Sequence, residues 1–234
     1  AKCLLEQEKA IIMNAKILKN ILPLCLLAML LGAGCTKNNY IDTGVSQGRH
    51  DCSLLEYMEK HPYDWDSTVV MVRHAELESL FERNELDGKH YDGITFFGIT
   101  NHSIRRYLLE NGLKQVTDLR AEACRDVLLR CIVEGKIYRN DIPRGKKSSG
   151  LSVIGEGGKY YTTLGGSDLW IFSFATSYGG VPNIGAVSLY GVILNASREF
   201  EIASADIEPN NCVVHSFDYA VTIDDFLKAG ESLK

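Results

Sequence analysis

The stretch from Ile21 to Gly34 (ILPLCLLAMLLGAG) is almost entirely apolar and ends directly before a single cysteine, Cys35. A membrane-spanning helix needs about 20 consecutive apolar residues, so this stretch is too short to cross a bilayer. Two lysines precede it on a segment that opens at Met13. A charged start, a short apolar stretch and small residues before a cleavage point are typical of a secretory signal peptide. We therefore predict that residues 13–34 are a signal peptide and take no part in the folded domain.

Small residues stand directly before Cys35, which becomes the first residue after such a cleavage. This arrangement resembles the lipobox of bacterial lipoproteins, whose cysteine is lipidated, although Gly32 replaces the usual leucine and Leu31 lies one place earlier. We predict that Cys35 carries a lipid that holds the protein to a membrane. In a Gram-negative cell, an aspartate directly after the lipidated cysteine is associated with inner-membrane retention, and Thr36 stands at this position instead. The outer membrane is therefore favoured, and which of its faces carries the protein stays open. The alternatives to a lipoprotein signal are a buried core helix and an ordinary secretion signal.

The remaining chain divides by composition. If Met13 is the natural start, residues 1–12 are a non-native upstream segment, and whether they are translated stays open. Residues 36–49 are polar and without period, so residues 35–50 are expected to be the lipidated cysteine and a flexible tether. Residues 51–234 have the length of one ordinary domain, and we predict a single one.

The charge balance limits the partners. The sequence has a net charge of −5, and residues 1–34 carry four lysines and two glutamates, so the remainder has a net charge of −7. An acidic surface disfavours nucleic acid and anionic headgroups. We expect no nucleic-acid partner and membrane contact only through the lipid on Cys35.

Four cysteines remain in the domain: Cys52, Cys124, Cys131 and Cys212. Cys124 and Cys131 lie seven residues apart in a helical pattern, roughly 10 Å by helical rise and too far for a disulfide. Buried thiols behaving as small apolar side chains are favoured, and a Cys131–Cys212 bridge stays open.

Helical patterns dominate the first half of the domain. Ser53 and Glu56 form a capping box before a short helix. Asp66 is placed to cap a longer helix, and Ile94–Ile99 is an apolar strand. A helix follows Asn101, and another covers residues 120–130.

Strand patterns punctuated by glycine turns dominate the second half. The expected strands are Lys159–Leu164, Leu169–Phe174, Val187–Leu194, Glu201–Ala205 and Cys212–Ile223. Helices followed by strands predict an α+β domain with an antiparallel sheet system.

Three ordered segments resemble the fasciclin domain. Thr95–Asn101 (TFFGITN) is similar to a motif that reads approximately T-V-F-A-P-T-N, and Val127–Ile137 (VLLRCIVEGKI) is similar to the helix-to-strand crossing before a V-x-G-K turn. Ala205–Ile207 followed by Asn211–Asp218 (NCVVHSFD) is similar to the closing motif. The resemblance spans about residues 52–223. It implies a fasciclin-like fold, with N-terminal helices packed on an antiparallel sheet wedge or sandwich.

The motif residues predicted to matter structurally are Thr100, Asn101, His215 and Asp218. Thr100 and Asn101 stand where a strand turns into a helix, where side chains cap exposed N–H groups. His215 is expected to be a core histidine that fixes the closing strand. Arg130-Cys131 replaces the Tyr-His pair linked to adhesion in animal members, so integrin-type binding is not carried over.

No nucleophile elbow, phosphate loop or zinc motif is present in the sequence. We therefore predict no catalytic, cofactor or metal site, and hence no enzyme. Residues 155–158 (GEGG) are expected to form a hairpin turn. The basic stretch of Arg144, Lys146 and Lys147 is expected to be a solvated connection, with contact to an anionic ligand as the alternative. Trp65 and Trp170 are expected in the core rather than stacked on sugars.

These observations predict a lipid-anchored envelope protein that mediates adhesion or binds a surface glycan or protein. The alternative is a structural accessory subunit of an envelope polysaccharide-uptake complex. A third hypothesis, an unrecognised hydrolase, is disfavoured because no catalytic set is present.

Overall fold

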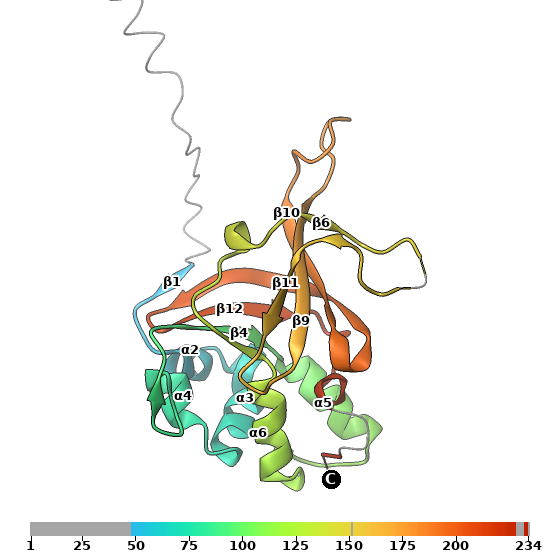
Figure 1. The fold of residues 1–234 in the computed structure, drawn as a ribbon. Coiled ribbons are helices and arrows are strands. Elements are labelled where there is room, and N and C mark those ends of the chain that lie inside the picture. The colour runs from blue at the N-terminus through green and yellow to red at the C-terminus, as the bar shows by residue number, and fades with distance from the viewer. Residues whose placement is uncertain (1–47, 151, 228–231, 234) are drawn as a thin grey trace, which may run out of the picture. The chain divides into compact units, whose positions relative to one another are not determined.

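The computed structural model describes residues 48–150, 152–227 and 232–233 (Figure 1). They belong to one compact unit, Gln47–Lys234. The predicted signal peptide, Cys35 and the tether up to residue 47 lie outside the described residues. Within the described part, no helix has the length and apolar character needed to span a bilayer.

The first helices begin where local chemistry predicts, with one exception. Helix α2 (Leu54–Lys60) starts after Ser53, whose side chain accepts a hydrogen bond from the Glu56 N–H at 3.2 Å. Helix α3 (Pro62–His74) starts at its proline and not after Asp66, which lies inside the helix. The helix begins at the proline because the fixed φ and missing N–H of proline suit the first helical position.

The expected long helix is in fact two. Helix α3 ends at His74, and α4 (Glu78–Arg83) begins after a turn in which Glu76 has a φ of 53°. Helices α5 (Asn101–Glu110) and α6 (Ala121–Leu129) lie where the sequence predicts them. The described residues also form four short 3-10 helices, Val116–Asp118, Arg139–Asp141, Leu194–Ala196 and Ile223–Phe226.

The main sheet has the order β5-β4-β12-β11-β10-β9-β8, and β1 pairs with β11 outside this path. Its strands are β1 (Arg49–His50), β4 (Ile94–Gly98), β5 (Ile132–Glu134), β8 (Lys159–Thr162), β9 (Asp168–Ala175), β10 (Val187–Ile193), β11 (Arg198–Pro209) and β12 (Cys212–Phe217). Two small ribbons complete the described strands: β2 (Glu85–Leu86) with β3 (Lys89–His90), and β6 (Gly145–Lys146) with β7 (Glu156–Gly157). The predicted α+β class is confirmed.

The prediction of an antiparallel sheet is wrong at two strand pairings. Strands β12 and β4 pair in parallel, with Val214 opposite Phe96, and β1 also runs parallel to β11. The alternation of apolar residues along a strand is the same whether the strand runs parallel or antiparallel to its neighbour. More than a hundred residues separate β4 from β12, so only tertiary packing sets their relative direction.

Strand β11 joins two parts of the sheet. Its first residues pair with β10, and its later residues pair with β12 across two register shifts. Asp206, beyond these first pairs, has a φ of 60°. Such bulges bend a strand and increase its twist, and Figure 1 shows β9 and β10 crossing the direction of β4 and β12.

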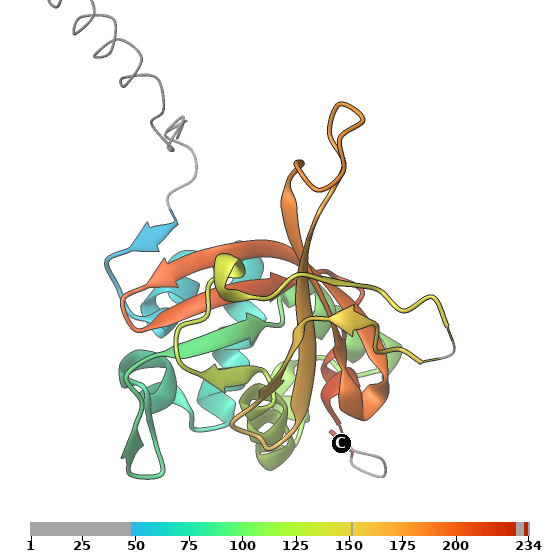
Figure 2. The same ribbon diagram turned by 45° about the horizontal axis from the view of Figure 1, so that its top comes forward.

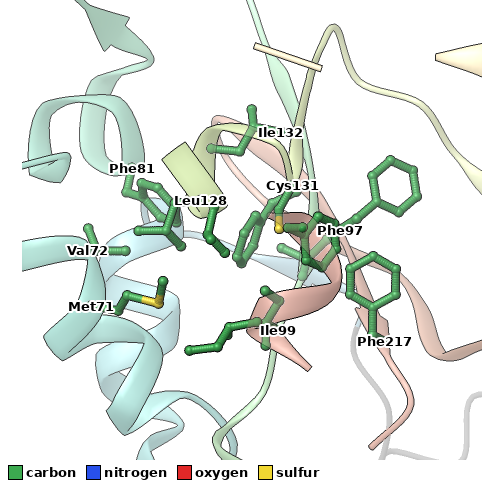
Figure 3. Packing of buried hydrophobic residues seen from close by; sticks show 14 of the residues in the cluster. Met71, Val72, Phe81, Phe97, Ile99, Leu128, Cys131, Ile132 and Phe217 are labelled. Carbon is green, nitrogen blue, oxygen red and sulfur yellow. The ribbon is translucent and has the colours of Figure 1, made fainter. Parts of the chain in front are cut away.

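The helices bury one face of this sheet. Figure 3 shows Leu128 between Met71 and Phe81 from the helices on one side and Phe97 and Phe217 from the strands on the other, all in one cluster. All five side chains are at most 2% exposed. Burying each such large side chain contributes about 1.5–3 kcal/mol relative to leaving it in water, so this layer is the main source of stability.

A second apolar cluster lies on the other face of β9 and β10. It contains Trp170, Phe172, Tyr190 and Val192, whereas Leu169 and Ile171 belong to the main core. Alternate residues of a strand point to opposite faces. Figures 1 and 2 show the segment between β5 and β8 crossing these strands, and Val153 and Ile154 from that segment pack on the second cluster. Both tryptophans are therefore core residues, Trp65 at 2% and Trp170 at 1% exposure.

Candidate functional site

The parallel pairing of β4 and β12 brings together motif residues that are far apart in the sequence. Thr100 and Asn101 follow β4, and Asp218 directly follows β12. Because parallel strands have their carboxyl ends at the same edge, both motifs arrive at one place. Asn101 is 1% exposed, whereas Thr100 and Asp218 are partly accessible.

Asn101 joins two helices and does not cap its own. Its Oδ1 accepts a hydrogen bond from the Ser67 N–H at 2.7 Å, and its Nδ2 donates to the carbonyls of Pro62 and Tyr63 at 2.8 Å each. These groups belong to the first turns of α3. The Asn101 amide therefore holds α3 to the start of α5.

Thr100 occupies the N-cap position of α5 without a side-chain capping bond. The expectation that these two side chains cap α5 is thus wrong, because Asn101 is engaged by α3. Thr100 instead lines a pocket of about 510 Å³ at this edge, which we call the motif pocket. It is defined by Asp64, Thr100, His102, Ser216, Asp218 and Tyr219, together with neighbours from α2, α3 and β11.

The motif pocket combines hydrogen-bonding groups with an exposed ring. Tyr219 is 73% exposed, and Asp218 keeps its place because its Oδ1 accepts from the Ala220 N–H at 3.1 Å. Tyr63, which precedes the lining residue Asp64, is 79% exposed, and its ring lies 6.2 Å from that of His102. Carboxylates accept hydrogen bonds from hydroxyl groups, and tyrosine rings offer an apolar face with a polar end. The pocket is suited to recognising a polar ligand with an apolar face.

His215 lies in the core and not in the pocket. Its Nδ1 faces the Asp206 N–H at 3.4 Å and its Nε2 lies 2.9 Å from the Ile137 carbonyl, so the tautomer with a proton on Nε2 satisfies both nitrogens. The ring is fully buried and stacks on Phe97 with centroids 5.4 Å apart. Burial lowers the pKa of His215, which keeps the imidazole neutral between two segments that it joins.

The cysteines do not provide a nucleophile in this unit. All four are free and buried, so the bridge between Cys131 and Cys212 is not formed. Burial raises the pKa of Cys124 to about 12 and that of Cys131 well above its ordinary value. A thiol that stays protonated is unreactive. Among the described residues, no group of three or more histidine, cysteine or acidic side chains is arranged to hold a metal ion.

Comparisons with known proteins find similarity only among solved structures. No protein-family model matches the sequence, and no curated protein matches it. A solved structure of a FAS1 domain pair from the insect cell adhesion molecule fasciclin I is similar, with a TM-score of 0.37 and 12% sequence identity. The matched part covers 73% of this chain and 46% of that one, so this chain spans less than half of the matched structure. A similarity of this size does not establish a shared fold.

Sequence reasoning missed most members of the motif pocket, among them Asp64, His102 and Tyr219. Asp64, His102 and Tyr219 come from α3, α5 and the segment after β12, and no local pattern connects them. Tyr219 lies inside the strand that the sequence predicts over Cys212–Ile223, whereas β12 ends at Phe217. The predicted strand is too long, and the pattern gave no sign that Tyr219 is exposed at the edge of the sheet.

Proposed function

We propose that this chain is a non-enzymatic, lipid-anchored protein of the cell envelope whose fasciclin-like domain mediates adhesion by binding a surface glycan or protein. The motif pocket is the observation that carries the proposal. Thr100 and Asp218, singled out in two distant motifs, line it together with the exposed Tyr219. No cofactor or metal is part of the proposal.

The fasciclin-like assignment is supported by the order of the three sequence motifs. The first ends in Thr100-Asn101 and the last ends in Asp218, and these motifs lie on neighbouring parallel strands. Because the two motifs pair with each other in the fold, the residues of each motif have a structural role there. Asn101 and His215 each join separate segments by hydrogen bonds.

The anchor is supported by the sequence alone. The apolar stretch before Cys35 has the length of a secretory signal, and we propose the outer membrane as the location, on either face. Mass spectrometry of the purified membrane form tests this point. We expect a chain that begins at Cys35 with added lipid mass; an unmodified Cys35 or a chain that begins at Ala1 would remove the anchor.

Binding by the full chain, solubilised in detergent micelles, to a glycan array tests the proposed function. We expect binding that is lost in Tyr219→Ala and weakened in Asp218→Asn, which retains the bond to the Ala220 N–H. Tyr160→Ala is the matched control, because Tyr160 is 53% exposed on β8 and outside the motif pocket.

The array also separates the alternatives. Absence of glycan binding together with a stable partner in a pull-down would favour an accessory subunit of a polysaccharide-uptake complex. Turnover of a glycan that a single substitution abolishes would contradict the non-enzymatic proposal.

A further inference from the structure

A second pocket lies on the face of β9 that is turned away from the helices. Phe172 and Phe174 from β9 form its apolar floor, and Asn183 from the following hairpin loop lies at its wall. Arg144, Lys146, Lys147 and Glu156, in and next to the β6–β7 ribbon, complete its rim. We call this the hairpin pocket; its volume is about 650 Å³, within the range of small-molecule sites.

Close backbone packing builds the hairpin pocket. The Trp170 Nε1–H donates to the Gly157 carbonyl at 3.1 Å, and the Ser173 N–H donates to the Pro143 carbonyl at 2.9 Å. A Cβ at Gly145 would lie 2.6 Å from the Phe172 Cβ, and one at Gly157 would lie 2.4 Å from the Arg144 carbonyl oxygen. The ribbon is therefore seated directly on β9, and the rim charges have fixed backbone positions.

The rim of the hairpin pocket contains cations that form no ion pair with a described residue. Most other described lysines and arginines form ion pairs with carboxylates, as Arg125 does with Asp87 at 2.9 Å. Neither Arg144 nor Lys146 forms an ion pair with any described residue, and both are exposed. In a chain of net charge −5, this is a local excess of positive charge.

Of the other charged groups at the rim, Lys147 already has a contact within the protein. The Lys147 Nζ lies 3.5 Å from the centroid of the Tyr190 ring, and Tyr190 donates a hydrogen bond to Glu199. Lys146 and Glu156 stand opposite each other in the ribbon without an ion pair between them. Arg144 and Lys146 are thus the cations available to a ligand, and the Glu156 carboxylate is available to accept from hydroxyl groups.

The ligand that complements this arrangement has one apolar face, hydroxyl groups and carboxylates. The aromatic floor accommodates the apolar face of a ring, and arginine pairs with a carboxylate through two parallel hydrogen bonds. Nucleic acid is a poor fit, since two free cations on an acidic protein do not neutralise a phosphate backbone. A carboxylated sugar has all the required groups on each ring.

We propose that the hairpin pocket is a binding site for acidic oligosaccharides built from uronic acids. Arg144 and Lys146 contact the sugar carboxylates, Phe174 packs against a ring face, and Asn183 and Glu156 bond to hydroxyl groups. The site is distinct from the motif pocket, because they share no lining residue. The inference therefore stands whether or not the motif pocket binds a ligand.

Isothermal titration calorimetry of the full chain in detergent micelles, with tetragalacturonate as the probe, tests the proposal. We expect binding that weakens as salt rises, because screening acts on exposed charge pairs. The double variant Arg144→Gln/Lys146→Gln should bind about tenfold more weakly or worse, because two charge-assisted contacts are lost. Phe174→Ala should also weaken binding, and the fully methyl-esterified tetramer should bind poorly.

Two controls make the outcome decisive. Arg105→Gln/Lys114→Gln removes the same charge from exposed cations outside the pocket, and Tyr219→Ala removes the ring of the motif pocket. Both should bind tetragalacturonate as the parent does. The proposal is overturned if the parent does not bind, if the Arg144/Lys146 double variant binds equally well, or if tetraglutamate binds as tightly as the sugar.

Discussion

At the scale of single residues, buried polar side chains connect segments that are distant in the sequence. Asn101 links α5 to α3, and His215 links β12 to Ile137 and to Asp206 in β11. Thr95 likewise donates to the Gly135 carbonyl at 2.6 Å and accepts from the Ile137 N–H at 2.9 Å. A buried polar group without partners is costly, so each of these residues requires its neighbours to be in place.

Substitution of Asn101 tests this at the helix junction. Asn101→Ala leaves a buried N–H and two carbonyl groups without their partner, and we expect a loss of about 1–3 kcal/mol in the free energy of unfolding. Urea denaturation followed by circular dichroism measures it. Asn210→Ala, at an exposed asparagine, is the control and should change stability little. An unchanged midpoint in Asn101→Ala would contradict the joining role.

His215 should make stability depend on pH. Burial lowers its pKa in the folded state, whereas a histidine in the unfolded chain has a pKa of about 6.5. Below that pH the unfolded state binds more protons than the folded state. The free energy of unfolding should therefore decrease as the pH falls below about 6.5, and the contribution of the neutral His215 side chain should be complete above that pH.

Denaturation curves at several pH values measure this dependence. His215→Gln should reduce the slope below about pH 6.5, since Asp206 and Arg139 nearby are unchanged in both proteins. His215→Ala should lower stability by about 1–3 kcal/mol at neutral pH. Equal slopes in the parent and in His215→Gln would show that other groups carry the acid sensitivity.

At the scale of elements, the β6–β7 ribbon depends on glycines for its contact with β9. Gly157 has a φ of 69° and leaves no room for a Cβ, whereas Gly166 has a φ of 71° and open space around it. The two positions have nearly the same φ and differ in packing. Substitutions at these two positions therefore separate the free-energy cost of a positive φ from the cost of the close contact.

This difference gives a matched pair of substitutions. Gly166→Ala should cost about 1 kcal/mol from the left-handed backbone alone. Gly157→Ala should cost more and should also change the fluorescence of Trp170, whose Nε1–H donates to the Gly157 carbonyl. Thermal melts and tryptophan emission measure both effects. Equal losses in the two variants would show that the ribbon yields without cost.

At the scale of the whole molecule, the described part of the chain has one main core between the sheet and the helices, and a smaller one under the β6–β7 segment. Four free thiols lie within the main core: Cys52, Cys124, Cys131 and Cys212. Stability in this unit therefore comes from apolar packing and not from covalent links. Redox conditions should not change the fold.

Thiol labelling tests that expectation. Cys124, Cys131 and Cys212 should resist a thiol reagent in native buffer and react together when urea unfolds the domain, because burial protects them and raises their pKa values. Peptide mapping by mass spectrometry assigns each site. Rapid labelling of any one of them under native conditions would show local opening of the core.

The sequence by itself determined the α+β class, the change from helices in the first half of the domain to strands in the second half, the cap at Ser53 and the burial of both tryptophans. Periodicity and capping are local, so they need no knowledge of distant contacts. Tertiary structure alone decided the parallel pairing of β4 and β12, and with it the meeting of Thr100 and Asp218 at one edge. It also decided the seating of Arg144 and Lys146 over the outer face of β9. Strand direction and the position of a loop over a sheet depend on packing between residues far apart in the chain, which no local pattern records.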